Sequence, residues 1–346
     1  MQVLKTCRSD WGVDTILKPK HHILKDFKFE SGEVLPELEL EYATQGIEKK
    51  DEDGNIENVF MYLHGWSGDY TSVQSLNDVI GSGKVIDTNS LYVISPTALG
   101  SPGSASPSTS DIRADFPQYT IKDMIMAHYR LITEKLEIKY IRGIMGTSMG
   151  GFQALNWALE FPEIIDFLIL NGTSHCISNR MYGVYSLMNR IIMDDPGYNA
   201  GNYIFNPITA MENSANLSFL WSLSPQYYEK CFASSNEIIS AVEEMRAEAR
   251  AWDANDIFWR NKALLGHDLS AKLSNIKIPA LVIGIKEDQV VDVPNNIIPL
   301  HNGLENSKIF VHNSILGHYG CVKDIKNASG AIENFMSSQK ELTKKI

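Results

Sequence analysis

One serine of this chain lies between two glycines at a spacing that suits nucleophilic chemistry. The segment GTSMG, at residues 146–150, follows an apolar run at 140–145 and precedes a helical pattern at 151–161. A serine on a tight turn from strand to helix forms a nucleophile elbow, which presents its hydroxyl at the end of the strand. The glycines permit the turn because side chains there would crowd the neighbouring strand and helix. We therefore predict that Ser148 is a nucleophile.

A serine hydroxyl reacts only when a base takes its proton, and the base needs an acid to orient it. Asp288 follows the apolar run at 281–285, and His318 lies in the loop after the apolar run at 309–311. Each side chain thus comes just beyond the carboxyl end of a predicted strand, where open α/β sheets carry their sites. The predicted catalytic residues are Ser148, Asp288 and His318.

Other residues could supply the acid or the base. Glu287 and Asp292 neighbour Asp288, which we favour for its spacing from the strand end. His312 is expected inside its strand, so we interpret it as a structural residue. The remaining histidines lack a comparable setting: His21, His22, His128, His175, His267 and His301. No spacing of histidines, cysteines or carboxylates indicates a metal site, so we expect neither a metal nor a cofactor.

The reaction also needs two donors for the oxyanion that forms on the attacked carbonyl. The amide of Met149, directly after the serine, is one candidate. The second should come from the loop after an early strand. The segment HGWSG at 64–68 follows the apolar run at 58–63, and the amide of Trp66 is its best candidate. An ordinary glycine turn is the alternative interpretation of that loop.

The elements that must position these residues alternate between strand and helix. Predicted strands cover 58–63, 91–95, 140–145, 167–170, 280–285 and 308–312, and predicted helices cover 120–136, 151–161 and 325–336. An antiparallel hairpin is expected at 27–42, and the Gly/Pro/Ser-rich stretch 100–110 is expected to be a loop. The alternation predicts an α/β fold with a mostly parallel sheet and helices on both faces.

A region of different character interrupts this alternation. Between residues 174 and 266 the strand patterns disappear, and helical segments rich in aromatic residues and methionine take their place. We predict a core domain formed by residues 1–173 and 267–346. Residues 174–266 are then an inserted helical lid over the strand ends.

Composition narrows the class of protein. The 346 residues are 44% hydrophobic with a formal net charge of −11, which favours a soluble protein and disfavours nucleic acid or anionic membranes as partners. No apolar run approaches the roughly 20 residues that cross a bilayer, and residues 1–14 lack the apolar stretch of a secretory signal. Cys7, Cys176, Cys231 and Cys321 are widely scattered, as expected for reduced thiols in a cytoplasm.

Motifs along most of the chain resemble those of the homoserine O-acetyltransferase family of α/β-hydrolases. They include FESG at 29–32, YATQG at 42–46, DFP at 115–117, SMGG at 148–151, DAN at 253–255 and GH at 317–318. The resemblance implies an α/β-hydrolase fold and acyl transfer through an acyl-serine, with Ser148, Asp288 and His318 as the triad. It also implies a homodimer formed through the helical lid.

Two departures from the family concern the acyl acceptor. Tyr319 stands where the acetyltransferases usually carry an aspartate that helps hold the amino acid. Residues 211–221 contain no arginine, whereas the family's lid arginine binds the homoserine carboxylate. Because a carboxylate in a buried tunnel needs a cationic partner, homoserine should bind poorly. The family also has esterase-like members, whose pattern the segment WDAND at 252–256 resembles.

We therefore expect a cytoplasmic serine hydrolase that acts on a small carboxylic ester, with Tyr319 and Arg113 as candidate substrate contacts. The alternative is a homoserine or serine O-acetyltransferase with acetyl-CoA as co-substrate, in which Arg113, Arg180 or Arg190 replaces the missing arginine. A third interpretation is a catalytically silent binding protein of the same fold.

Overall fold

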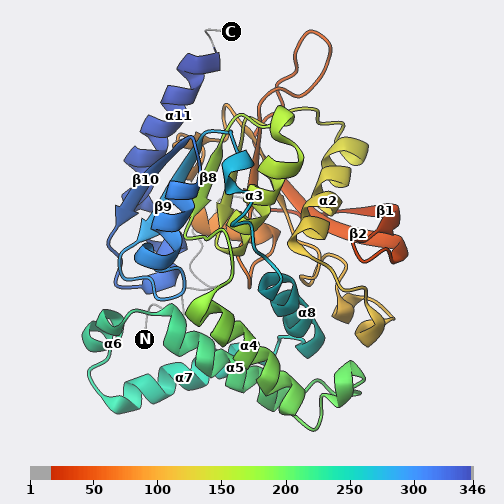
Figure 1. The fold of residues 1–346 in the computed structure, drawn as a ribbon, viewed down its shortest axis with the longest axis vertical. Helices are drawn as coiled ribbons and strands as arrows, with labels where there is room; N and C mark the ends of the chain where they lie inside the picture. Colours follow the sequence, from red (N-terminus) through yellow and green to blue (C-terminus); the bar gives the residue numbers. More distant parts are fainter. Residues whose placement is uncertain (1–16, 344–346) are drawn as a thin grey trace.

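An eight-stranded sheet organises the computed structural model, which describes residues 17–343 (Figure 1). The strand order is β1-β2-β6-β3-β7-β8-β9-β10. β2 pairs antiparallel with β1 and β6, and the remaining pairs are parallel. The bounds are β1 (Lys20–Lys28), β2 (Val34–Gln45), β3 (Val59–Leu63), β6 (Tyr92–Pro96), β7 (Gly143–Thr147), β8 (Leu168–Asn171), β9 (Ala280–Ile285) and β10 (Ser307–His312). Cys7 and the segment tested for a signal peptide lie outside the described residues.

The central strands are apolar on both faces because helices cover both. In β3, Met61 and Leu63 join one core cluster, whereas Phe60 and Tyr62 join another. The first cluster includes residues of α2 (Ile121–Arg130), α3 (Met149–Glu160) and α9 (Ile298–Gly303). The second includes residues of the 3₁₀ helix η1 (Tyr70–Leu76) and of α11 (Ser329–Thr343). The predicted fold class is confirmed.

Most predicted elements occur with shifted ends. The hairpin strand β1 begins at Lys20, well before the predicted start, and α2 continues as one π-helical turn to Lys135. β7 begins three residues late, because the residues before it make only the isolated bridge Ile141–Ile165. α11 begins at Ser329, after a 3₁₀ turn. The pattern also missed β4 (Ile80–Gly81) and β5 (Ile86–Asp87), which are too short to show a period.

Five helices form the region where strand patterns disappear. They are α4 (Asn179–Asp194), α5 (Ile208–Ser222), α6 (Pro225–Cys231), α7 (Ser235–Ala249) and α8 (Ala254–Leu265). Figure 1 shows them, green to teal, gathered at one end of the sheet. α5, α6 and α7 share a small core that includes Phe219, Tyr227 and Met245. The helical character of this region is as predicted, and the exact domain limits stay a prediction.

Two further sequence predictions concern the described part of the chain. Cys176, Cys231 and Cys321 are free thiols, as the prediction of reduced cysteines requires. Among the described helices, none is both long and apolar enough to cross a membrane.

The turn between β7 and α3 is crowded from both sides. Ser148 has φ 53° and ψ −117°, a backbone conformation that L-residues rarely adopt. A Cβ atom on Gly146 would lie 2.2 Å from the carbonyl oxygen of Gly150, and one on Gly150 would lie 2.0 Å from that of Leu63. Glycine is therefore required at both positions by close approach of backbone.

Replacing Gly150 with alanine should destabilise the fold, because the Leu63 carbonyl that the new methyl group meets is backbone of β3, which pairs with β7. We expect Gly150→Ala to lower the free energy of unfolding by about 1–3 kcal/mol in urea titrations. Gly183→Ala is the matched control. Gly183 lies in α4 with open space around its Cα, so alanine there should be neutral or stabilising by up to about 1 kcal/mol. Equal stability of both variants would contradict the crowding argument.

Candidate active site

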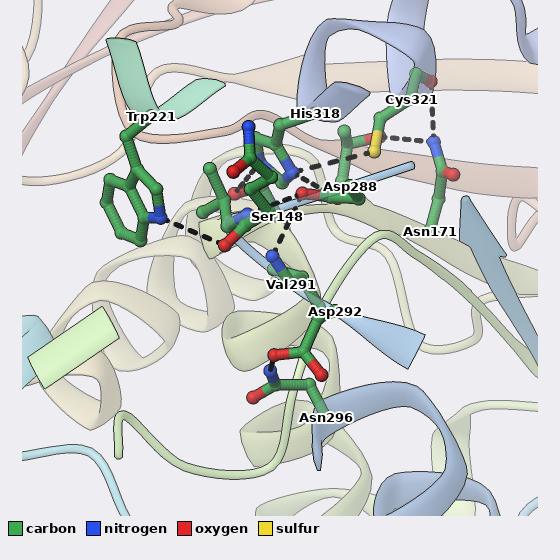
Figure 2. A network of polar contacts seen from close by, with 12 residues as sticks. Ser148, Asn171, Trp221, Asp288, Val291, Asp292, Asn296, His318 and Cys321 are labelled. Carbon is green, nitrogen blue, oxygen red and sulfur yellow. Dashed lines mark hydrogen bonds and ion pairs between the residues drawn. The ribbon is translucent and has the colours of Figure 1, made fainter. Parts of the chain in front are cut away.

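Three residues from separate segments meet at the carboxyl ends of the central strands. The Nε2 atom of His318 lies 2.9 Å from the hydroxyl oxygen of Ser148, and its Nδ1 atom lies 2.7 Å from Oδ2 of Asp288 (Figure 2). The Asp288 side chain is fully buried, and that of His318 is 17% exposed. The structure thus brings the three predicted residues into one hydrogen-bonded chain.

The acid is held by the backbone of its own loop. Oδ1 of Asp288 accepts hydrogen bonds from the amides of Val290 and Val291, at 2.7 and 3.0 Å. This leaves Oδ2 directed at His318, so Nδ1 carries the proton and Nε2 faces Ser148 as the acceptor.

The alternative acids and the alternative base lie elsewhere. Glu287 accepts a hydrogen bond from the amide of Ser314. Asp292 caps the following π-helical turn by accepting from the amide of Asn295. His312 is the last residue of β10, and its Nδ1 atom contacts the carbonyl of Asn313. The preference for Asp288 and His318 therefore agrees with the geometry.

Charge and burial set the proton affinity of His318 in opposite directions. Burial by itself lowers the pKa of His318, but the charge of the Asp288 carboxylate and its hydrogen bond to the imidazole raise the pKa well above 6.5. Burial raises the pKa of the Cys321 thiol, which lies 3.9 Å from Nδ1 of His318. A neutral thiol therefore sits beside the imidazole.

The loop that contains Trp66 lies against the elbow. A Cβ atom on Gly65 would lie 3.5 Å from Cβ of Ser148. Met149 is the first residue of α3, and the amides at a helix N-terminus are available to bind negative charge. The side chain of Met149 is buried in the core. Both predicted oxyanion donors thus belong to segments that adjoin Ser148.

A pocket of about 260 Å³ opens above Ser148. Its lining includes Trp66, Ser148 and His318 from the sheet side and side chains from α4, α5 and α7. The apolar and aromatic lining residues include Tyr62, Trp66, Tyr185, Met188, Trp221, Met245, Trp252, Val290 and Val322. The indole of Trp221 donates to the carbonyl of Gln289 at 2.9 Å, which ties α5 to the loop of Asp288 (Figure 2). The inserted helices therefore shape the pocket.

The predicted substrate contacts are not all brought to this pocket. Tyr319 lines it. Arg113 is exposed and donates to the carbonyl of Tyr203, Arg180 donates to the carbonyl of Gln289, and Arg190 pairs with Asp194. None of the three arginines is among the described lining residues. Within that lining, Lys323 is the residue of lysine or arginine type.

Donor atoms suitable for a metal also meet here, although no sequence spacing indicated it. Among the described residues, one such group was found: ligand atoms of Asp288, His318 and Cys321 lie within 4.8 Å of one another. The spacing missed them because Asp288 comes from a different loop than His318 and Cys321. Asp288 and His318 already bond to each other through two of these atoms. The expectation that the protein binds no metal stays a prediction.

Sequence reasoning missed several neighbours of the site. Cys321 follows His318 by three residues, a spacing that puts both on one side of a helical turn. Arg260 and Asn261 of α8 contact Trp66, yet they lie about 195 positions further along the chain. No local pattern reveals such long-range contacts.

Comparison with known proteins yields sequence relatives named as acyltransferases and solved structures of the same fold that include an esterase. A family model described as "alpha/beta hydrolase fold" matches residues 58–319. A protein of Methanothermobacter thermautotrophicus named "Probable acyltransferase" is 38% identical over 313 residues, 90% of this chain and 96% of that protein. The homoserine O-acetyltransferase of Bacillus anthracis superposes with a TM-score of 0.80 at 25% identity, covering 93% of this chain and 98% of that chain. The acetyl esterase MekB shares the fold, with a TM-score of 0.84 at 21% identity, covering 92% and 97%. The fold class and the resemblance to the homoserine O-acetyltransferases are thus confirmed.

The charge of Asp288 should be measurable in the titration of His318. We expect NMR titration to place the pKa of His318 above 6.5, and Asp288→Asn to lower it, because the amide removes the stabilising charge. Because the folded pKa exceeds the unfolded one, protonation of His318 stabilises the fold below about pH 6.5, and this contribution is lost as pH rises through the folded pKa.

His64 is an internal control for this titration. Burial lowers its pKa to about 4, so its resonances should not shift between pH 6 and 9. The variants His318→Gln and His64→Gln assign the signals. A pKa of His318 below 6.5, or one that Asp288→Asn leaves in place, would contradict the electrostatic account.

Proposed function

Because this chain belongs to the alpha/beta hydrolase fold family, we propose that it hydrolyses short-chain carboxylic esters through an acyl-serine at Ser148. The observation that carries this proposal is the hydrogen-bonded chain from Asp288 through His318 to the Ser148 hydroxyl, at the floor of a pocket. A nucleophile, a base within hydrogen-bond reach and an acid that orients the base are the parts that acyl transfer needs.

The first half of the reaction acylates the enzyme. The Ser148 oxygen attacks the ester carbonyl while Nε2 of His318 takes the hydroxyl proton, and Asp288 stabilises the imidazolium. The amides of Trp66 and Met149 donate to the oxyanion, each accounting for roughly 3–4 kcal/mol of transition-state stabilisation. Collapse breaks the ester bond, and His318 gives its proton to the leaving alcohol.

The second half releases the acid. A water molecule takes the place of the alcohol, and His318 accepts one of its protons as the oxygen attacks the acyl carbonyl. Collapse of this second tetrahedral intermediate frees the carboxylic acid and returns the proton to Ser148. The same residues serve both halves, so no further cofactor is required.

The pocket favours small, largely uncharged substrates. Aromatic and methionine side chains from α4, α5 and α7 dominate its upper wall, and desolvating a charged group against them would be costly. A volume of about 260 Å³ leaves room for a short acyl group and a small alcohol. We therefore propose a short-chain ester as the substrate class.

Ser148→Ala should abolish turnover of p-nitrophenyl acetate, because no other group forms the acyl-enzyme. We expect kcat to fall by at least about 10³-fold, as in other serine triads. Ser82→Ala, which removes an exposed hydroxyl from a loop, is the matched control and should retain parental kcat. Equal turnover by the parent protein and Ser148→Ala would overturn the nucleophile assignment. Failure of Ser148 to react with a fluorophosphonate probe would instead favour the catalytically silent interpretation.

The second candidate is transfer of an acetyl group from acetyl-CoA to the hydroxyl of homoserine or serine. Two observations favour it: a relative named "Probable acyltransferase" spans 90% of this chain, and Lys323 places a cation in the pocket lining. A cation there could bind the amino-acid carboxylate in place of the family's arginine. Tyr319, and the fact that no arginine is among the pocket-lining residues of the described chain, argue for water instead.

Competition between acceptors separates the two candidates. With acetyl-CoA as donor, we expect release of acetate to exceed formation of O-acetylhomoserine at millimolar homoserine, as quantified by mass spectrometry. Lys323→Met should then leave this ratio unchanged. Acetyl transfer well above hydrolysis, with a KM for homoserine that rises at least tenfold in Lys323→Met, would establish the transferase instead.

Two expectations accompany the proposal. A homodimer formed through the helical lid follows from the family resemblance, and a cytoplasmic location follows from the scattered cysteines and the composition. Both stay predictions.

A further inference from the structure

The loop at residues 64–68, which we call the oxyanion loop, is attached to the inserted helices by a buried arginine. We propose that Arg260 of α8 is a positioning residue that fixes the direction of the Trp66 amide. This inference rests on the proposed function, in which that amide binds the oxyanion. Arg260 is 3% exposed, and it lies on a lid helix rather than on the sheet that carries Ser148.

The peptide group before Cα of Trp66 is fixed from the sheet side. The carbonyl of Gly65 accepts from the amide of Gly68 at 3.0 Å and from Nδ1 of His64 at 2.7 Å. Nε2 of His64 accepts from the amide of Ala98 at 2.9 Å, so this buried histidine is the neutral Nδ1–H tautomer. In a trans peptide the N–H points opposite to the C=O. Holding the Gly65 carbonyl therefore directs the Trp66 amide away from His64.

The peptide group after Cα of Trp66 is fixed by Arg260. Nη1 of Arg260 donates to the carbonyl of Trp66 at 2.9 Å, and Nη2 donates to the carbonyl of Gly100 at 2.7 Å. The rigid guanidinium fork spans two carbonyls of two different loops. With both flanking peptides held, the two backbone dihedrals of Trp66 have little freedom.

The side chain of Trp66 is also held by α8 and its entry. Its indole Nε1 donates to Oδ1 of Asn261 at 2.8 Å, and its ring meets Trp252 edge-on at a centroid distance of 5.4 Å. The Arg260 guanidinium lies 5.7 Å from the Trp66 ring centroid. Helix α8 thus holds the oxyanion loop through both the backbone carbonyl and the indole of Trp66.

The charge of Arg260 faces two backbone carbonyls and is also attracted by the buried carboxylate of Asp256. In the part of the chain that the structure describes, no carboxylate forms a salt bridge with Arg260. Asp256, one turn earlier on α8, instead accepts from the amide and the hydroxyl of Ser108. A lysine could keep the charge but could not span both carbonyls, so substitution by lysine separates the effect of charge from the effect of geometry.

The test compares Arg260→Met and Arg260→Lys with Lys262→Met, which removes a cation from the same helix without touching the oxyanion loop. For p-nitrophenyl acetate, we expect both Arg260 variants to lower kcat by about 10–100-fold with little change in KM, because a misdirected donor weakens the transition state more than the ground state. Binding of a small alkylboronic acid, which forms a tetrahedral adduct on serine, should weaken by a similar factor. Lys262→Met should match the parent in both measurements.

A merely structural role would lower thermal stability without moving kcat and boronic acid affinity together. Folded Arg260 variants with parental kcat and parental boronic acid affinity would overturn the inference, and so would parental values in Arg260→Lys. If Arg260→Met does not fold, Arg260→Lys and Asn261→Ala decide, the latter with a smaller loss in the same direction. A parent protein that neither turns over the ester nor binds the boronic acid would overturn the proposed function and this inference together. An active parent with unaffected variants would overturn the inference alone.

Discussion

A fully buried carboxylate, held by two backbone amides and one imidazole, is the contact on which the site depends. The side chain of Asp288 has no exposed surface, and a carboxylate in such a place requires partners for both oxygens. The amides of Val290 and Val291 satisfy one oxygen, and His318 satisfies the other. Because the partner of Oδ2 is a histidine, the stability of the buried charge and the orientation of the base follow from the same hydrogen bond.

The sheet and the inserted helices contribute different parts of the site. The sheet supplies Ser148, Asp288 and His318 from loops at the carboxyl ends of β7, β9 and β10. The inserted helices supply much of the apolar pocket wall. Trp221 of α5 bonds to the loop that contains Asp288, and α8 holds the loop that contains Trp66. This division separates the groups placed for chemistry from the walls that surround them.

Patterns in the sequence predicted the elements whose formation depends on neighbouring residues in the chain. Apolar runs located β3, β8 and β9, which are buried on both faces, and the more exposed β10, each within one or two residues. The crowded glycines marked the elbow at Ser148. Long-range contacts escaped prediction. Arg113 was expected near the substrate because it is a cation, yet it bonds to Tyr203 at the surface, while Arg260 had no local signal. Contacts between residues far apart in the chain depend on how helices pack, which periodicity does not encode.

The central claim is that Ser148 carries the acyl group between donor and acceptor. Mixing the protein with p-nitrophenyl acetate, quenching with acid within the first turnover and mapping the peptides by mass spectrometry measures this directly. The account predicts one acetyl group per chain on the peptide that contains Ser148, formed as p-nitrophenol is released and missing in Ser148→Ala. Acetylation of Cys321 or Lys323 in place of Ser148, or steady turnover with no acylated Ser148 peptide at any time, would contradict it.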